Sequence, residues 1–376
     1  MARSPAWILG GGLVTALGRG LPAHAHALKE GVARPAISPV TFMGRQLPFH
    51  FASDPRDEGA SFRRLMETAV GDALEDAALP PDALARMGLF VGSTCLDLPL
   101  HEADYAASYA RGTMPAVKEP GYGHIARDIA ARFGIHGPQY TFSTACSSSA
   151  NAVLYAREML AGGRIDHALV VGAEGYNRLS LLGFGGLMLL AREAYRPFDR
   201  ERDGLILGEG VGAVVLGRDA RPGGAAIIGG ATACDPSSPT SSSAERVAEV
   251  IQEALADAGL PPAGVLAIKA HGTGTPINDL SESRALVGVF KGAVPPLTSI
   301  KPALGHTLGA CGAIELLALL ACWREGFLPP TPGFREADAA AGVRPEVRAR
   351  PLGPGTLLCN FIGFGGNNTS LVLARS

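Results

Sequence analysis

The order of apolar and polar positions divides the chain into short apolar runs and longer amphipathic stretches. The short runs are rich in Val, Ile and Leu and end at Gly or Pro, a pattern typical of buried strands. The longer stretches place apolar residues three or four positions apart, and this spacing predicts helices with one buried face. The predicted strands are 7–14, 87–92, 138–142, 167–172, 205–216 and 265–270, with a last strand after residue 368, and a turn is predicted at the glycines of the first one. The predicted helices are 22–32, 61–78, 125–133, 151–160, 245–258 and 311–322.

Two further stretches follow neither pattern. Residues 33–60 are rich in proline and are predicted to be irregular, and residues 96–123 are predicted to form an excursion outside the core. Elsewhere strands alternate with helices, and such alternation is typical of parallel sheets covered by helices. The predicted fold class is therefore α/β.

Part of the first half of the sequence recurs in the second half. The segment ALEDAALPP at 73–81 aligns with ALADAGLPP at 254–262, so a helix–turn–strand unit repeats after 181 residues. A repeat of this length indicates an internal duplication. We therefore expect two similar α/β halves, residues 1–220 and 221–376, divided at the segment RPGG.

Composition limits the class of protein. With 376 residues, 47% of them hydrophobic, the chain is long enough to form two packed halves. A formal charge of −2 gives no reason to expect a nucleic-acid partner. The six cysteines show no CxxC pair and no pairing with histidine, which argues against a metal site and against a disulfide scaffold. We expect a reduced, cytoplasmic protein.

The N-terminus has some features of a signal peptide. Arg3 precedes an apolar run at 6–17, and the segment AHA at 23–25 imitates a cleavage site. Three glycines at 10–12 interrupt the run, so we favour a first strand over a signal peptide. No apolar run has the length of a membrane span.

A strand and a helix are predicted to meet at the segment STACSSSA of residues 143–150. Cys146 therefore lies at a helix start, where unpaired backbone N–H groups and the helix dipole favour an anion. A thiol in such a place can have its pKa lowered from about 8.5 to about 3.5–7.5, which produces a reactive thiolate. The alternative is that Cys146 is a small buried apolar residue, as free cysteines often are.

Three further motifs are rich in glycine, and two of them also carry histidine and threonine. HGTGTP at 271–276 follows a predicted strand, and its small residues let a ligand approach the backbone. His306 lies in KPALGHTLGA at 301–310, and NFIGFGGNN at 360–368 is predicted to be a glycine-rich turn. Each motif is weak alone. Together, a nucleophile at a helix start and two histidines are the groups that acyl transfer through a thioester requires.

With these motifs in this order, the chain resembles the β-ketoacyl-acyl carrier protein synthases, which are condensing enzymes of thiolase-like fold. The resemblance covers nearly the full length of the chain. It implies duplicated α/β halves stacked in five layers, αβαβα. The motifs that carry it are TACSS at 144–148, RPFD at 196–199 with RDG at 202–204 and GEG at 208–210, HGTGT at 271–275, Lys301 with GH at 305–306, and GFGG at 363–366.

The resemblance also implies a reaction that needs neither cofactor nor metal. An acyl group passes from an acyl carrier protein to Cys146, and a malonyl unit then loses CO2 and attacks that acyl group. The resemblance implies that Cys146 is the nucleophile, that His271 and His306 stabilise the enolate, and that Lys301 and Glu282 support this pair of histidines. It implies that Glu315 anchors its own helix and that Thr273 and Thr275 contact the phosphopantetheine arm. It also implies that the N–H groups of Cys146 and Phe364 form the oxyanion hole and that Phe364 acts as a gate.

Two kinds of partner are implied by the same resemblance. One is the acyl carrier protein, and the other is a second subunit, in a homodimer or in a heterodimer with a chain-length-factor-like chain. Carrier proteins of this kind are acidic, so we expect a basic docking patch despite the formal charge of −2. The candidate residues for this patch are Arg63, Arg64, Arg111 and Lys118.

Two other readings of the motifs stay open. A CoA-dependent thiolase-like enzyme would share the fold but use a second cysteine as its base, and the late Cys359 lies outside the glycine-rich turn. A chain-length-factor subunit typically lacks the nucleophile, whereas this chain retains Cys146, His271 and His306. The chain can nevertheless be the active subunit paired with an inactive sister chain.

Departures from the family pattern bear on the pathway. Asn367 stands where many relatives carry threonine. The segments 187–195 and 231–244 are shorter than in the fatty-acid enzymes, and both lie near the expected acyl pocket or dimer interface. These departures favour a specialised polyketide or polyene pathway over fatty-acid synthesis.

Overall fold

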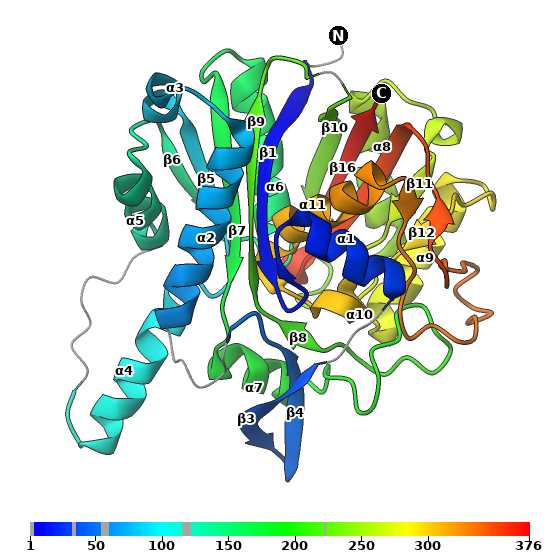
Figure 1. The fold of residues 1–376 in the computed structure, drawn as a ribbon. Helices are drawn as coiled ribbons and strands as arrows, with labels where there is room; N and C mark the ends of the chain where they lie inside the picture. The colour runs from blue at the N-terminus through cyan, green and yellow to red at the C-terminus, as the bar shows by residue number, and fades with distance from the viewer. Residues whose placement is uncertain (1–3, 32–34, 54–59, 115–121, 222) are drawn as a thin grey trace.

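A computed structural model describes residues 4–31, 35–53, 60–114, 122–221 and 223–376 (Figure 1). Five strands from the first half of the chain follow one another in the main sheet, in the order β1-β9-β7-β5-β6, and the short strand β2, Gly18–Arg19, pairs with β1 beside this path. Strands β1 and β7 both run antiparallel to β9, whereas β5 runs parallel to β7 and to β6. Their bounds are Ala6–Thr15 for β1, Gly88–Gly92 for β5, Gln139–Phe142 for β6, His167–Glu174 for β7 and Gly210–Gly217 for β9.

The second half of the chain repeats this arrangement strand for strand. Its order is β10-β16-β15-β11-β12, with β16 antiparallel to β10 and β15, and β11 parallel to β15 and β12. A short antiparallel pairing between β1 and β10 joins the two sets of strands. Their bounds are Ala225–Cys234 for β10, Ala267–Lys269 for β11, Leu297–Thr298 for β12, Gly355–Ile362 for β15 and Asn367–Arg375 for β16.

Helices separate and cover the two sets of strands (Figure 1). One long helix, with shorter helices beside it, contacts the first set from outside, and two helices contact the second set or each other from outside. Two more lie between the sets and contact strands of both. The α/β class with five layers is thus confirmed, and we infer from the repeated topology that the halves divide between β9 and β10. The helices are α2 Ala60–Ala77 on the first face, α6 Ser148–Ala161 and α11 Cys311–Arg324 in the middle, and α8 Ala244–Asp257 and α9 Pro276–Val289 on the last face.

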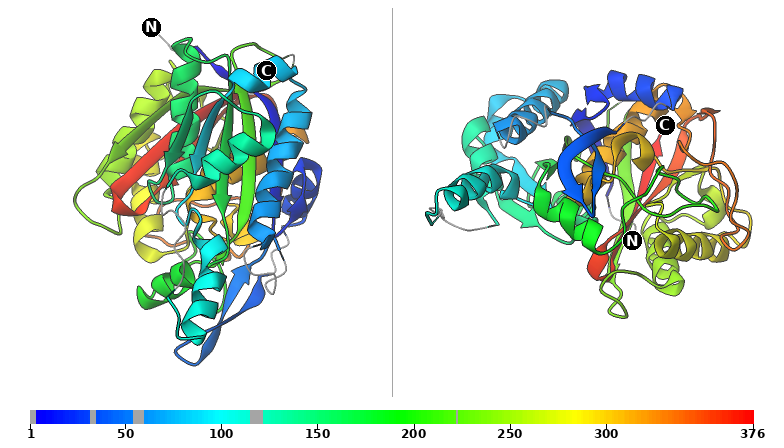
Figure 2. Two further views of the ribbon diagram at one scale, coloured as in Figure 1. Left: turned by 90° about the vertical axis from the view of Figure 1, so that its left-hand side faces the viewer. Right: turned by 90° about the horizontal axis from the view of Figure 1, so that it is seen from below.

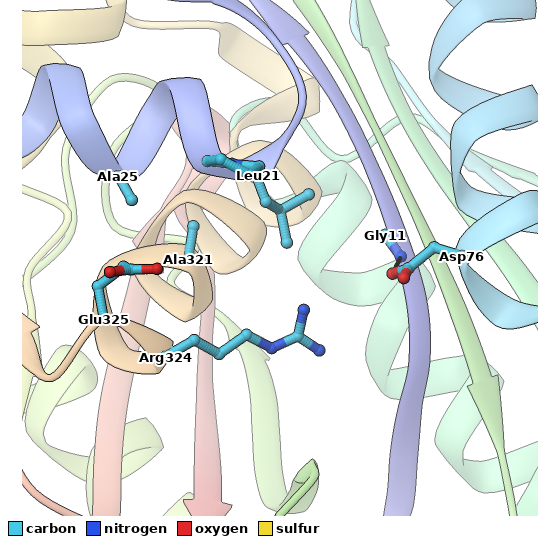
Figure 3. Close-up of a pocket in the computed structure, with 8 residues that line it drawn as sticks. Gly11, Leu21, Ala25, Asp76, Ala321, Arg324 and Glu325 are labelled. Carbon is cyan, nitrogen blue, oxygen red and sulfur yellow. Dashed lines mark hydrogen bonds between the residues drawn. The ribbon is translucent and has the colours of Figure 1, made fainter.

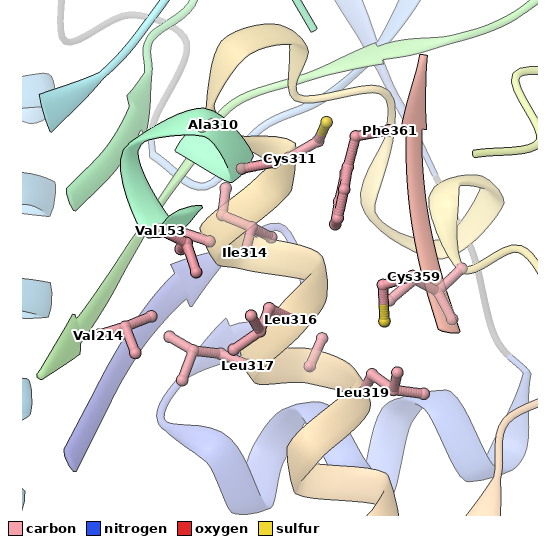
Figure 4. Close-up of a cluster of buried hydrophobic side chains, with 14 of the residues drawn as sticks. Val153, Val214, Ala310, Cys311, Ile314, Leu316, Leu317, Leu319, Cys359 and Phe361 are labelled. Carbon is pink, nitrogen blue, oxygen red and sulfur yellow. The ribbon is translucent and has the colours of Figure 1, made fainter. Parts of the chain in front are cut away.

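Helix α11 is the centre of the middle layer. Every residue from Cys311 to Trp323 is buried, as expected of a helix that is apolar around its whole circumference. Figure 4 shows Val153 of α6 and Val214 of β9 on one side of α11, and Phe361 of β15 on the other. Both halves of the chain therefore hold this helix in place.

The remaining elements surround this core. Helix α4 and the β3–β4 hairpin extend from one end of the molecule (Figure 2). Among the described residues, no helix is both long and apolar enough to cross a membrane. The bounds are β2 Gly18–Arg19, α1 Leu21–Glu30, β3 Ala36–Phe42, β4 Arg45–His50, α3 Pro81–Arg86, α4 Leu98–Ala110, α5 His124–Phe133, α7 Arg178–Gly186, β8 Leu207–Gly208, η1 Pro262–Gly264, α10 Lys301–Leu304, η2 Leu308–Ala310, β13 Phe327–Leu328, β14 Arg350–Pro351 and η3 Phe364–Gly366.

Two stretches differ from the sequence prediction. The segment predicted to be irregular contains the hairpin of β3 and β4, where Val40, Leu47 and Phe49 are buried at alternating positions. Its prolines obscured this alternation. The segment predicted to be an excursion contains the helix α4, whose side chains are mostly exposed. It therefore lacks the wide apolar face by which a packed helix is found in a sequence.

Two strand predictions also need correction. Strand β6 was expected to be buried, but it is the last strand of the sheet and its first two residues are exposed. Its two aromatic side chains, Tyr140 and Phe142, pack against Tyr155 of α6, but Tyr140 is still 36% exposed at this edge. The sequence pattern alone does not distinguish such an edge strand from a core strand. The glycines at 10–12 do not form the predicted turn. They lie within β1, which continues through a bulge between Ile8 and Gly10.

The glycines of β1 allow helix α2 to lie directly on it. A Cβ atom at Gly12 would stand 1.9 Å from the carbonyl oxygen of Ala69, and one at Gly10 would stand 2.4 Å from the backbone nitrogen of Ala77. Both distances are far shorter than van der Waals contact. Any side chain at these positions therefore forces α2 away from the sheet.

We expect Gly12→Ala to lower the free energy of unfolding by about 1–3 kcal/mol, the usual cost of overpacking a core. Gly71→Ala is the matched control, because it lies on α2 with no atom within 4 Å of the added carbon. It should leave stability unchanged or raise it by up to about 1 kcal/mol through helix propensity. Denaturant unfolding measures both values, and a neutral Gly12→Ala would contradict the close packing.

Candidate active site

The turn that carries Cys146 joins β6 to α6. Ala145 has a φ of 52°, in the left-handed region that residues other than glycine seldom adopt. The hydroxyl group of Ser148 stabilises the turn, because it accepts a hydrogen bond from the N–H group of Thr144 at 2.9 Å and donates one to the Ala145 carbonyl at 2.6 Å. The thiol therefore lies just before the first turn of α6, as the sequence predicts.

Two histidines from the second half of the chain face this thiol. His271 follows β11 and His306 follows α10. The Cys146 sulfur and one nitrogen of each ring all lie within 4.8 Å of one another. The Nε2 atom of His306 is 3.2 Å from the sulfur, and the two rings meet edge to face with centroids 5.4 Å apart. The fold thus brings together three residues that are far apart in sequence.

Burial sets the charges of these three groups. It raises the pKa of the Cys146 thiol to about 12, although the Lys301 ammonium and the Phe364 N–H group oppose the shift. It also lowers the pKa of His271 and His306 well below the usual value, and the Lys301 ammonium adds to this. The predicted lowering of the thiol pKa is therefore wrong, because loss of water outweighs the helix start. A neutral thiol lies beside a neutral imidazole that is able to accept its proton.

A buried ion cluster stands behind the site. The carboxylate of Glu315 on α11 binds the ammonium of Lys301 on α10 at 2.5 Å and the ammonium of Lys269 on β11 at 2.6 Å. All three side chains are at most 1% exposed. Lys301 and Glu315 are expected site residues, whereas the sequence analysis missed Lys269. Lys269 is a lysine within an otherwise apolar predicted strand, and this departure from the apolar pattern is the sequence feature that marks it.

Glu282 on α9 holds the backbone around His271. Its carboxylate accepts hydrogen bonds from the N–H groups of His271 at 2.8 Å and Gly272 at 2.9 Å, and from the side chain of Asn360 at 3.1 Å. Burial raises the pKa of Glu282, and these donors oppose the shift. Glu282 therefore lies beside one of the two histidines that it was expected to support, and that role stays a prediction.

The two threonines of the HGTGT motif line the same cavity as Cys146. The hydroxyl groups of Thr273 and Thr275 lie 2.9 Å apart, and both side chains are nearly buried. Asp279, which the sequence analysis missed, accepts hydrogen bonds from the N–H groups of Gly274 and Phe198. It therefore ties the histidine loop to the RPFD motif.

The cavity beside the thiol is small. Its free volume is about 20 Å³, room for about one water molecule. Phe364 lines it and stacks on Phe184 of α7, with ring centroids 5.6 Å apart and planes at 15°. Gly365 and Gly366 follow with φ values of 73° and 76°. An acyl chain therefore needs a rearrangement at this stack before it can reach Cys146.

Hydrogen bonds also fasten the turn that carries Phe364. The N–H group of Gly365 donates to Pro239, and the carbonyl of Gly366 accepts from the N–H group of Asp235. The Cys234 thiol lies 3.3 Å from the carbonyl oxygen of Gly365. The turn is thus held in its present conformation by one neighbouring segment.

A third buried carboxylate joins two loops at the site. Glu174, at the end of β7, accepts hydrogen bonds from the N–H groups of Thr94, Cys95 and Gly309 at 2.9, 2.6 and 3.0 Å. Burial raises its pKa to about 7 against the effect of these donors. The sequence analysis missed Glu174, although an acidic residue directly after an apolar strand marks the end of that strand near a site.

A larger cavity, of about 270 Å³, lies away from this site between α1, α2 and α11 (Figure 3). Arg324 at the end of α11 and Glu325 directly after it line this cavity, and Asp76 lines it from α2. The Asp76 carboxylate already accepts a hydrogen bond from the N–H group of Gly11. None of the expected site residues is among the described residues that line this cavity.

Two of the basic residues that were expected to bind a carrier protein contact other side chains of this chain. Arg63 forms an ion pair with Asp128 at 2.8 Å, and Arg111 donates to the hydroxyl group of Ser108. Lys118 lies outside the described residues. A carrier-binding patch at these positions stays a prediction.

Comparison with known proteins agrees with this geometry. Residues 43–221 match the family description "Beta-ketoacyl synthase, N-terminal domain", and residues 224–335 match "Beta-ketoacyl synthase, C-terminal domain". The chain is 30% identical over 329 residues to the 3-oxoacyl-[acyl-carrier-protein] synthase 2 of Vibrio cholerae serotype O1, a match that covers 81% of this chain and 80% of that protein.

Solved structures share the whole fold. The ishigamide ketosynthase/chain length factor matches with a TM-score of 0.88 and 28% identity over 100% of both chains. A ketosynthase from Xenorhabdus doucetiae, solved in complex with its chain length factor, matches with a TM-score of 0.84 and 27% identity over 99% of this chain and 98% of that chain. Since the two family domains together span most of the sequence and a relative is matched over most of its length, the chain belongs to the beta-ketoacyl synthase family and is a condensing acyltransferase.

Proposed function

We propose that this chain condenses malonyl-acyl carrier protein with an acyl group carried on Cys146, in a decarboxylative Claisen reaction. The observation that carries the proposal is the convergence of the Cys146 thiol with His271 and His306 in one buried cavity. The neutral state of all three groups suits a reaction in which protons and negative charge appear only transiently.

The first half-reaction loads the enzyme. As the Cys146 sulfur attacks the acyl thioester, its proton passes to Nε2 of His306, which is 3.2 Å away. The developing oxyanion accepts hydrogen bonds from the N–H groups of Cys146 and Phe364. The bond to the pantetheine sulfur then breaks, and that sulfur leaves with the proton held on His306. The imidazole returns to its neutral state.

The second half-reaction forms the carbon–carbon bond. The bond between the malonyl carboxylate and its α-carbon breaks and releases CO2, and the electron pair moves into the thioester as an enolate. His271 and His306 donate hydrogen bonds to the enolate oxygen from ring N–H groups, and for His306 this requires that the ring proton, which is on Nδ1 during loading, has moved to Nε2. The enolate carbon attacks the acyl carbonyl, and the bond from that carbonyl carbon to the Cys146 sulfur breaks. The departing thiolate takes one proton from solvent, so decarboxylation and condensation together consume one proton. Thr273 and Thr275 offer hydroxyl groups to the pantetheine arm that carries the malonyl unit.

We further propose that β6 pairs with a second subunit, either another copy of this chain or a chain-length-factor-like chain. Strand β6 is the last of the sheet and pairs only with β5 among the described strands. Tyr140 on β6 and Tyr155 on α6 are each 36% exposed and pack edge to face. An unpaired edge with exposed aromatic residues favours pairing with a partner strand. The two solved relatives whose names include a chain length factor support the heterodimer.

The pathway and location belong to the same proposal. All six cysteines are free thiols, which supports a reducing compartment and hence the cytoplasm. A specialised polyketide or polyene pathway is favoured over fatty-acid synthesis by the short segments near the acyl pocket. Identification by mass spectrometry of the acyl groups captured on Cys146 in cells tests this assignment, and saturated acyl chains alone would contradict it.

We expect substitutions at Cys146 and His271 to separate the two half-reactions. Cys146→Ala should abolish formation of the acyl-enzyme, because no other thiol faces His306 among the described residues. His271→Ala should reduce malonyl decarboxylation by roughly 10²–10³-fold, because it removes one donor to the enolate, and should change loading by less than about tenfold. Intact-mass analysis measures loading, and CO2 release measures decarboxylation. Cys322→Ala is the control, and equal loss of both half-reactions in His271→Ala would indicate a folding defect.

We expect Gly365→Ala to slow the loading of Cys146. Its φ of 73° disfavours alanine by about 1–2 kcal/mol, although the nearest atom to the added carbon is 3.5 Å away. The turn then no longer holds the Phe364 N–H group in place, and loading should slow by about tenfold, whereas decarboxylation by a loaded enzyme should change less. Gly259→Ala is the matched control, with a φ of 66° and no neighbour within 4 Å. If loading is unchanged and Phe364 has not moved in a structure of the acyl-Cys146 enzyme, then Phe364 packs over the pocket as a fixed side chain and is not a gate.

We expect Tyr140→Asp to dissociate the dimer, because it places a charge at the proposed strand pairing. Native mass spectrometry of the wild-type chain alone distinguishes a homodimer from a monomer that awaits a different subunit, and co-expressed partner chains are then captured with it. Val347→Asp is the control, since Val347 is also exposed but lies far along the chain in the second half. A Tyr140→Asp variant that keeps the wild-type assembly would reject β6 as the interface.

A further inference from the structure

Lys269 is one of the most completely buried charged side chains in the described part of the chain. It is 1% exposed, at the end of β11 and two residues before His271. Its ammonium donates to Glu315 at 2.6 Å and to the carbonyl oxygen of Asn360 at 2.8 Å, and it lies 3.7 Å from the centre of the Phe361 ring. A buried ammonium with this many partners is fixed in one position.

The partners of Lys269 are themselves parts of the site. Glu315 uses its other oxygen to bind Lys301, so one carboxylate lies between two ammonium groups. That arrangement alone leaves one uncompensated positive charge in the core. The second carboxylate is Glu282, whose pKa is raised by burial and lowered in part by the charge of Lys269. Two ammonium groups and two carboxylates thus lie beside His271, and their charges sum to zero.

We propose that Lys269 is a positioning residue of the condensing site, which fixes Glu315 between two ammonium groups and balances the charge of Glu282 behind the thiol and the histidines. The inference rests on the proposed function in that it takes Cys146 as the nucleophile. Lys269 does not touch the reacting atoms. It acts through Glu315 on Lys301, and through Asn360 on the strand that leads to the Phe364 turn.

The consequence of removing Lys269 follows from the charge balance. Without its ammonium, two carboxylates face a single ammonium, and the buried set carries one net negative charge. A nearby negative charge disfavours any anion, so the Cys146 thiolate becomes harder to form. Among the described residues, the titratable and charged groups that face the thiol and Lys269 from the packed elements are Glu174, Glu282, Glu315, Lys301, His271, His306, Tyr195, Cys311 and Cys359.

Alkylation of Cys146 by iodoacetamide measures this effect without any substrate. We expect Lys269→Gln to slow it about three- to tenfold at fixed pH, because below the thiol pKa a rise of half to one unit reduces the thiolate by that factor. The pH profile should move to higher pH with its shape unchanged. Lys269→Arg retains the charge and should stay close to wild type. Lys29→Gln is the matched control, since Lys29 also lies against a phenylalanine ring but far from the site.

The double variant Lys269→Gln/Glu282→Gln separates charge balance from packing, and it leaves the Lys301–Glu315 ion pair in place. It removes one charge of each sign, so alkylation should return to at least the wild-type rate; a packing role makes the double variant slower than the single one. Because removing one charge of each sign leaves no uncompensated charge in the core, the double variant also tests the proposal if the single variant does not fold. Equal slowing by Gln and Arg, or a double variant slower than wild type, would overturn the proposal. Peptide mass spectrometry assigns the alkylated residue, so this result is independent of condensing activity.

Discussion

Glu315 binds two ammonium groups in a part of the core that water does not reach, and much of the site depends on that arrangement. Its helix α11 lies between the two halves of the chain, and its ligands come from β11 and from α10. An unpaired carboxylate or ammonium at this depth would cost several kcal/mol, so each of the three groups requires the others. The loops that carry His271 and His306 begin directly after those two elements, and the ion cluster therefore fixes where the rings stand.

The exclusion of water from the site is a second consequence of its position deep in the core. The same burial that makes the ion cluster necessary keeps Cys146 protonated and both histidines neutral. A charge that appears at the thiol or on an enolate meets prearranged donors and an ammonium in a medium with little water to screen them. Without substrate, the thiol and both histidines are therefore uncharged. The surrounding hydrogen-bond donors and the ammonium group mainly stabilise the negative charge that develops during the reaction.

Close packing also limits access. The free volume beside Cys146 is about 20 Å³, and the stacked rings of Phe184 and Phe364 cover it. Two consecutive glycines with positive φ follow Phe364, and a Cβ atom at Gly366 would stand 1.9 Å from the Asp235 carbonyl. The turn is thus tightly fitted to one neighbouring segment, and opening of the cavity requires those contacts to change together.

The sequence by itself determined the elements with strong local signals. The repeat at 73–81 and 254–262 indicated a duplicated α/β chain, and the motifs around Cys146, His271 and His306 identified the family and its three converging residues. Only the tertiary structure revealed Lys269 and Glu174 as buried charges, because sequence order does not show which polar groups face each other in the core. It also decided the state of Cys146. A helix start favours a thiolate locally, but burial by elements distant in sequence raises the thiol pKa to about 12. Desolvation is a property of the whole fold, and for that reason no local pattern predicts it.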